Sequence, residues 1–163
     1  MIIRAALKDT DAGLANSKAI GEREIHTLME DLANAIRAKD VDSLMTHYAS
    51  DVLTFDLLPP LQYQGVDAIR QRVSQWFSSF RGPIGLEMRH LSITAGYDLA
   101  FWSSLNGSTG INKDGAKIEM WWRATNGFRK IGGKWLVTHG HSSEPFDVKT
   151  GKALLHLKPS RDI

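Results

Sequence analysis

Asp56 is the first residue of this 163-residue chain whose surroundings suggest chemistry. It follows an apolar segment, Val52-Leu53-Thr54-Phe55, and precedes the double proline Pro59-Pro60. A carboxylate in such surroundings is poorly solvated, which makes it a usable general base for abstracting a proton next to a carbonyl. The alternative is structural, because aspartates commonly hydrogen-bond the backbone of the turn that follows them.

His139 and His141 stand two residues apart in a predicted strand, so both side chains should project from the face that carries Val137. Two imidazoles so placed could ligate a metal or act in acid–base catalysis. Glu144 follows His141 one residue too early for the metal-binding spacing of a cupin, so we predict no metal site. His139 is predicted as an acid–base residue and His141 as a ligand contact. Alternatively, neighbouring serines and backbone groups satisfy both rings.

Arg123 lies in an aromatic-rich segment, residues 120–126. Strand alternation places Trp121, Arg123 and Thr125 on one face and Met120, Trp122 and Ala124 on the other. One face should line a ligand cavity and the other should meet a subunit or solvent, and the sequence leaves open which. An arginine between large rings needs a partner or an anion, so we predict that Arg123 stabilises developing negative charge.

Further aromatic and polar side chains are candidates for lining a cavity, although such rings more often form a core. The predicted ligand-binding residues are Tyr48, Tyr63, Trp76, Phe80, Trp102, Trp121, Thr125 and His141.

The elements that must position these residues follow from hydrophobic periodicity. A helix is predicted to open at Gly21, a short helix to follow Asp40 as its cap, and a third to run over residues 66–80 until Gly82-Pro83. Alternating apolar segments predict strands at residues 51–58, 61–64, 86–95, 98–109, 116–129 and 134–142. The order predicts an α+β fold with one domain at 21–146, an N-terminal arm at 1–20 and a C-terminal tail at 147–163.

Composition excludes several classes of protein. The chain has no cysteine, which removes disulfides, thiol nucleophiles and zinc ribbons. The net charge is only +2 and no Lys/Arg run exceeds two residues, so no nucleic-acid partner is predicted. Neither a signal peptide nor a membrane span is recognisable, and we expect a cytoplasmic protein without a membrane partner.

Three segments resemble the nuclear-transport-factor-2-like superfamily, in particular its SnoaL-like and ketosteroid-isomerase-like branch. They are residues 48–52 (Tyr-Ala-Ser-Asp-Val), residues 63–70 (Tyr-Gln-Gly-Val-Asp-Ala-Ile-Arg) and residues 128–145, which end in an H-x-H-x-S-x-P pattern. The resemblance implies a cone-shaped, cystatin-like α+β fold in which three N-terminal helices pack on a curved, mostly antiparallel sheet. It also implies a homodimer formed through the sheet.

In ketosteroid isomerase the general-base aspartate occupies the place that Asp56 matches here. The aspartic acid of that enzyme's oxyanion hole has no counterpart in Arg123-Ala124-Thr125-Asn126, which argues against the isomerase reaction itself. Three hypotheses follow. The first is a cofactor-free isomerase, cyclase or dehydratase acting on a small apolar carbonyl compound, the second a non-catalytic binding protein for such a molecule, and the third a dimeric assembly module.

Overall fold

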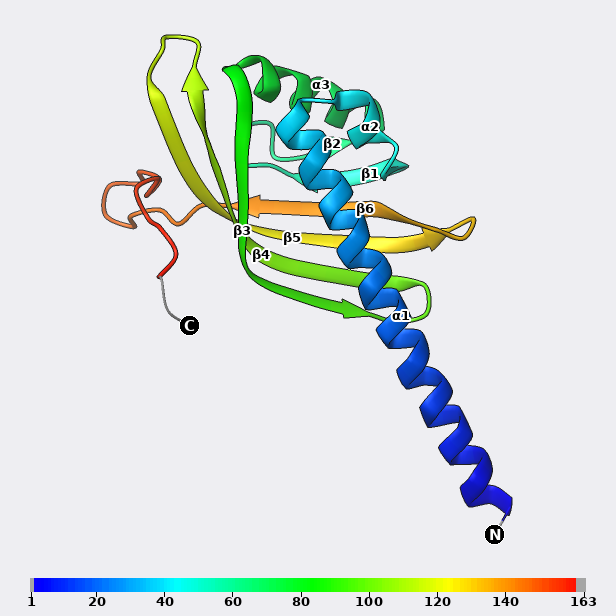
Figure 1. Ribbon diagram of the computed structural model, residues 1–163. Coiled ribbons are helices and arrows are strands. Elements are labelled where there is room, and N and C mark those ends of the chain that lie inside the picture. Colours follow the sequence, from blue (N-terminus) through cyan, green and yellow to red (C-terminus); the bar gives the residue numbers. More distant parts are fainter. Residues whose placement is uncertain (1, 161–163) are drawn as a thin grey trace.

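The computed structural model describes the backbone of residues 2–160 and the side chains of residues 13–160. Within this range three helices pack on one six-stranded sheet (Figure 1). The helices are α1 (Ile2–Ala38), α2 (Val41–Met45) and α3 (Val66–Ser78). The strands are β1 (Tyr48–Phe55), β2 (Tyr63–Gln64), β3 (Phe80–Ala95), β4 (Leu99–Asn112), β5 (Lys117–Ile131) and β6 (Lys134–Ser143).

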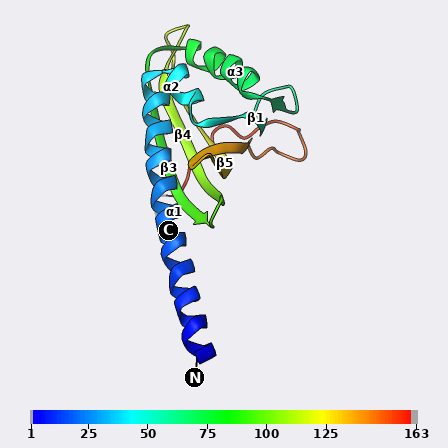
Figure 2. The same ribbon diagram turned by 90° about the vertical axis from the view of Figure 1, so that its right-hand side faces the viewer.

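The strands lie in the order β2-β1-β6-β5-β4-β3. Every neighbouring pair is antiparallel except β1 and β6, which run parallel because the chain returns to the first strand after the β3–β6 meander. Figures 1 and 2 show α1 lying along the sheet, with α2 and α3 at one end of it. The predicted α+β fold, with helices on a curved and mostly antiparallel sheet, is confirmed.

The first helix differs from the prediction, because it begins at Ile2 and passes through Gly21 without a break. Residues 2–20 contain no proline and several alanines, leucines and lysines, which favour continued helix. Gly21 has a packing role instead. A Cβ at this position would lie 3.0 Å from the Cβ of Ala95, so glycine lets α1 approach the end of β3 closely. The N-terminal part of α1 projects beyond the sheet (Figure 2).

Most other boundaries shift by up to three residues, but β3 begins at Phe80, six residues before its predicted start, and runs through Gly82-Pro83. Asp40 caps α2 as predicted, accepting a hydrogen bond from the Ser43 backbone N–H at 2.9 Å. The third helix ends at Ser78, so Phe80 belongs to β3 and not to the helix. Phe80 is buried, and a Cβ on Gly110 would lie 2.5 Å from its ring, so the glycine on β4 makes room for it.

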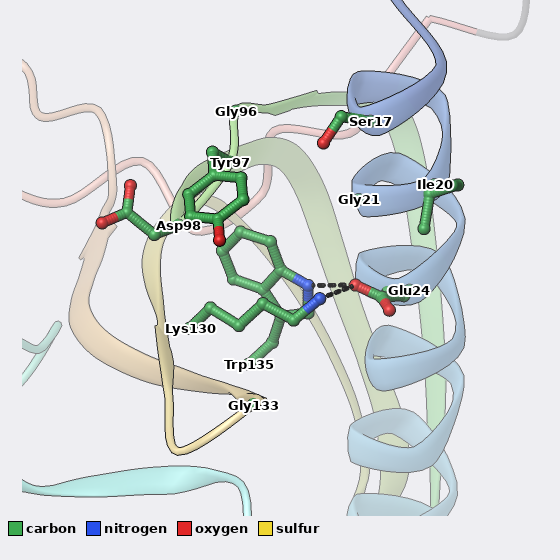
Figure 3. A pocket seen from close by; sticks show the side chains of 10 residues that line it. All are labelled: Ser17, Ile20, Gly21, Glu24, Gly96, Tyr97, Asp98, Lys130, Gly133 and Trp135. Atoms are coloured by element: carbon green, nitrogen blue, oxygen red, sulfur yellow. Dashed lines mark hydrogen bonds and ion pairs between the residues drawn. The ribbon is translucent and has the colours of Figure 1, made fainter. Parts of the chain in front are cut away.

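A hydrogen-bonded clamp fixes α1 to the far end of the sheet. The Glu24 carboxylate accepts hydrogen bonds from Lys130 Nζ and Trp135 Nε1, each at 2.7 Å (Figure 3). These donors, Lys130 first, hold the pKa of Glu24 below its ordinary value of 4.5. The small cavity beside the clamp, about 320 Å³, is lined in part by the three clamp residues, whose polar groups bind one another, and we assign it a structural role.

None of the described helices is both long and apolar enough to cross a membrane.

Candidate functional site

The largest candidate site is a cavity of about 510 Å³ between the helices and the sheet. Side chains from all three helices, from five strands and from the C-terminal tail line it. Most of the wall is apolar, with Met29, Leu32, Ile36, Val73, Trp76, Met88, Met120, Trp122 and Val137 among its members. An apolar cavity with a few polar groups is the usual form of a small-molecule site.

The floor of the cavity is the sheet, whose register sets the cavity-facing side chains in rows. Trp102 of β4 pairs with Asn126 of β5, which in turn pairs with Gly140 of β6. A Cβ on Gly140 would lie 3.0 Å from Asn126 Oδ1, so this glycine leaves space for the amide. This row therefore presents an indole and an amide to the cavity.

The next row of cavity-facing side chains lies two residues further along the strands, and it includes carboxylates. Phe55 of β1 pairs with His141 of the parallel β6, and Asp56 and Ser142 each follow by one residue. Glu144 follows two residues later, and all three side chains line the cavity. Because β1 and β6 are parallel neighbours, they end at the same edge of the sheet and bring Asp56 and Glu144 to the same end of the cavity.

Asp56 forms an ion pair with Arg72, which α3 extends over the cavity. Asp56 Oδ1 accepts hydrogen bonds from Arg72 Nη2 at 3.0 Å and from the Leu58 backbone N–H at 3.1 Å. Only 24% of the Asp56 side chain and 13% of the Arg72 side chain are exposed. Both of these hydrogen bonds end on Oδ1, so within the described part of the chain Oδ2 is the carboxylate oxygen that is open to a ligand. Arg72 Nε is buried without an acceptor.

Tyr48 supplies a phenol close to this pair. Burial raises the pKa of Tyr48 to about 12, and the negative charge of Asp56 acts in the same direction. The phenol is therefore protonated across the physiological range and can donate a hydrogen bond to an oxygen on a ligand.

Glu144 lines the cavity, and its Oε1 is buried without a hydrogen-bond partner among the described residues. Burial raises the pKa of Glu144 above its ordinary value of 4.5, while the positive charge of Arg123 opposes the shift. A carboxyl with a raised pKa binds its proton more tightly in the folded protein than in the unfolded chain. Its contribution to stability is therefore complete below pH 4.5 and is lost as the pH rises through the folded-state pKa.

We expect Glu144→Gln to raise the midpoint of thermal unfolding at pH 7.5 and to leave it nearly unchanged at pH 4, because glutamine is never charged. Glu119→Gln is the matched control. Hydrogen bonds from Lys158 and then Trp121 lower the pKa of Glu119, so the sign is opposite and this variant should lose stability at pH 7.5. A gain for Glu144→Gln that is equal at both pH values would contradict the assignment.

Four of the residues predicted for the site meet in the cavity, namely Asp56, Tyr48, Trp76 and Trp102. Phe80 and Tyr63 are not among the residues that line it. The Phe80 ring packs edge-on against Trp76 with centroids 6.1 Å apart, and Tyr63 donates its hydroxyl hydrogen to the Pro59 carbonyl at 2.8 Å. Their roles as direct ligand contacts have no support in this geometry.

The remaining five predicted residues, Arg123, Trp121, Thr125, His139 and His141, lie on the opposite face of the sheet. The cavity takes the Met120, Trp122 and Ala124 face of β5, so Arg123 and its two companions face away from it. Trp121 donates its Nε1 hydrogen to Glu119 at 3.0 Å, and the guanidinium over its ring belongs to Arg89 and not to Arg123.

A β-bulge in β6 accounts for the position of the histidines. Val137 pairs with Phe128 while His139 pairs with Gly127, so two residues advance on β6 for one on β5. The extra residue turns His139 and His141 away from the face that carries Val137, which corrects the predicted alternation. Both rings pack edge-on against Phe55, with centroids 5.1 and 5.8 Å away. Within the described residues no third acidic or imidazole ligand joins them in a metal-binding group.

Arg72 and the tail are the parts of the site that the sequence interpretation missed. Arg72 lies four residues before Trp76 on α3, so the two side chains share one face of the helix. This spacing could have identified Arg72 as a residue of the cavity from the sequence. The tail contributes to the cavity wall through Ala153 and Leu155. A bridge between Phe146 and Ala153 and a hydrogen bond from Leu154 N to the Pro145 carbonyl at 2.8 Å hold it there.

Comparison with solved structures identifies close matches in architecture. A nuclear-transport-factor-2-like protein of unknown function from Pseudomonas putida KT2440 is 35% identical, over 86% of this chain and 98% of that chain, with a TM-score of 0.79. A candidate dehydratase of the same family from Streptomyces avermitilis is 13% identical, over 79% and 99% of the two chains, with a TM-score of 0.70.

The association domain of C. elegans CaMKII is 18% identical, over 78% of this chain and 98% of that chain, with a TM-score of 0.64. At such low identity the last two matches show a shared fold only. The comparison with curated proteins gives no significant match. The SnoaL-like domain family matches residues 25–147, which is most of the chain and includes nearly the whole cavity. The chain therefore belongs to the SnoaL-like domain family of the nuclear-transport-factor-2-like superfamily.

Proposed function

We propose that this protein is a cofactor-free acid–base enzyme whose substrate is a small, mostly apolar carbonyl compound. The observation that carries the proposal is the Asp56–Arg72 pair, set into the wall of an otherwise apolar cavity of about 510 Å³. Isomerisation, aldol cyclisation and dehydration all begin with the removal of a proton next to a carbonyl, and a positioned carboxylate can perform that step. The fold shared with a candidate dehydratase is compatible with this chemistry.

Each group near Asp56 has a role in this step. The C–H bond next to the carbonyl breaks, its electron pair forms the C=C bond of an enolate, and the proton passes to Asp56 Oδ2. The negative charge that develops on the carbonyl oxygen is stabilised by the positive charge of Arg72 and by the Tyr48 hydroxyl. Arg72 Nη2 meanwhile holds the carboxylate in place. His139 and Arg123 have no part in this step, because they stand on the other face of the sheet.

The proposal is tested by hydrogen–deuterium exchange of 2-tetralone, a bicyclic ketone used as the probe, in D₂O. Proton transfer to Asp56, exchange of that proton with solvent and return of deuterium label the ketone, and proton NMR follows the loss of the α-proton signal. We expect the protein to accelerate exchange well beyond buffer containing the same concentration of acetate. Exchange at the buffer rate would contradict an enzymatic role.

Non-catalytic binding is the second candidate function, and the apolar lining of the cavity favours it equally. The same probe separates the two. A ketone that binds, as measured by chemical-shift changes of the protein, without faster exchange supports the binding protein. Binding together with accelerated exchange supports the enzyme.

We also propose a homodimer formed through the outer face of the sheet. Leu99 and Phe101 of β4 are exposed large apolar residues on that face, where Phe101 pairs with Gly127 beside His139. Light scattering at micromolar concentration should give twice the chain mass of 18.2 kDa. Phe101→Asp should shift the mass to that of the monomer, and a wild-type protein of monomer mass would exclude the dimer.

A further inference from the structure

The described part of the C-terminal tail, residues 147–160, supplies one wall of the cavity. Ala153 and Leu155 line the cavity, although both lie beyond the last strand. The tail leaves the end of β6 and folds back on itself (Figure 1), and the bridge between Phe146 and Ala153 closes it into a loop. Leu155 follows this loop and is 52% exposed, so a large part of its side chain has no protein neighbour. The position of this wall residue therefore depends on what holds the rest of the tail.

One ion pair ties the tail to the sheet. Lys158 Nζ donates a hydrogen bond to Glu119 Oε2 on β5 at 2.7 Å, and among the described residues this is the only hydrogen bond or ion pair between the tail and a strand. Glu119 lies on the outer face of the sheet, whereas Leu155, three residues before Lys158, lines the cavity on the other face. The last pair between β5 and β6 is at Arg123, so residues 117–122 of β5 have no strand partner on that side. This unpaired edge gives the tail a way round from one face to the other.

Glu119 is itself held in place on the outer face. Its Oε1 accepts a hydrogen bond from Trp121 Nε1 at 3.0 Å. The indole lies against Gly107, where a Cβ would come within 2.7 Å of the ring, and the Arg89 guanidinium stands 5.1 Å from the ring centroid. The hydrogen bonds from Lys158 and then from Trp121 lower the pKa of Glu119, so the carboxylate is charged at neutral pH. An anchor that its own strand already holds loses little conformational freedom when the lysine binds it.

We propose that Lys158 and Glu119 are positioning residues for ligand binding, because they hold Ala153 and Leu155 in the cavity wall from the opposite face of the sheet. Neither Lys158 nor Glu119 lines the cavity, so their effect on a ligand passes through the tail. When the pair is broken, the tail samples positions in which this wall is missing, and the apparent affinity falls with the fraction of molecules that keep it. The inference rests on the proposed use of the cavity as a ligand site, and it does not depend on turnover.

Titration of the full ¹⁵N-labelled chain with 2-tetralone, followed by chemical-shift changes of the protein, tests the proposal. We expect the dissociation constant to rise about two- to fivefold in Lys158→Glu, the scale of an exposed ion pair, because 60% of the lysine side chain and 40% of the glutamate side chain are exposed. Lys158→Arg keeps the charge and should bind the ketone like the wild type. Lys18→Glu is the matched control, since it makes the same change of charge in an exposed pair on α1 that does not line the cavity, and it should leave the affinity unchanged.

The salt dependence separates an electrostatic tie from a loss of packing. The quantity compared is the dissociation constant of Lys158→Glu divided by that of the wild type. This ratio should fall toward one when NaCl is raised from about 0.05 M to about 0.5 M, because salt screens the attraction in the wild type and the repulsion in the variant. Salting-out of the ketone acts on both proteins alike and cancels. A ratio of one at low salt, or a ratio that salt does not change, overturns the role of the pair.

The order of the tail gives a second readout that needs no ligand. The ¹H–¹⁵N heteronuclear NOE of the Leu155 and Lys158 amides should be high in the wild type and in Lys158→Arg, and lower in Lys158→Glu. Equal order in all three proteins, or a wild type that binds no 2-tetralone up to its solubility limit, overturns the proposal. If 2-tetralone exchange is accelerated while Lys158→Glu binds like the wild type, the proposed function stands and only the role of the tail fails. An affinity that depends on the pair without accelerated exchange keeps the role of the tail and supports the binding protein.

Discussion

Asp56→Asn should slow the exchange of the 2-tetralone α-protons by about 10²–10⁴-fold, the usual contribution of a positioned general base. Asparagine has nearly the same shape and can still accept the hydrogen bonds from Arg72 Nη2 and the Leu58 N–H. Its amide cannot accept a proton at neutral pH, so the change removes the base and keeps the turn. Proton NMR of the ketone in D₂O measures the effect, and affinity should change far less than rate.

Asp51→Asn is the matched control for this experiment. Asp51 lies on the same strand, is exposed, and is absent from the cavity wall, so the same chemical change should leave the exchange rate within about twofold of wild type. An Asp56→Asn variant that exchanges the probe at the wild-type rate would show that the carboxylate only supports the turn. Equal losses in the two variants would point to a general effect of charge.

Local sequence patterns predicted most of the fold because each element carries its own signal. The α3 stripe and the four long strands with glycine-containing turns between them appear within three residues of their predicted bounds, except that β3 begins six residues early. The start of α1 could not be predicted from Gly21, because the reason for this glycine is its contact with Ala95, 74 positions further along the chain. Periodicity carries no information on such a long-range approach.

The sequence predicted a residue of the candidate site only where the neighbouring residues in the chain already mark that residue as functional. Asp56 was found because an apolar strand precedes it and a turn follows it, and both features are visible in the sequence. Arg72 was missed because its importance comes from its partner, 16 residues earlier on another element. The histidines were misplaced because one inserted residue in β6 reverses every side chain after it, and strand alternation assumes that no such residue exists.

Phe128→Ala should lower the free energy of unfolding by about 3–5 kcal/mol, the range for removing a buried phenylalanine ring. Phe128 is 1% exposed and belongs to the core that α1 covers. Since domains of this size are stable by only about 5–15 kcal/mol, the loss is a large share of the total. Urea unfolding followed by circular dichroism measures it, and the slope against urea should stay constant.

Phe146→Ala is the matched control, because Phe146 lies outside the strands of the sheet and is 61% exposed. It should lose no more than about 0.5 kcal/mol, the usual range for a surface substitution. A Phe128→Ala loss similar to that of Phe146→Ala would contradict the assignment of Phe128 to the core. If Phe128→Ala does not fold, Phe128→Leu, which keeps much of the apolar volume, should still fold and lose about 1–2 kcal/mol.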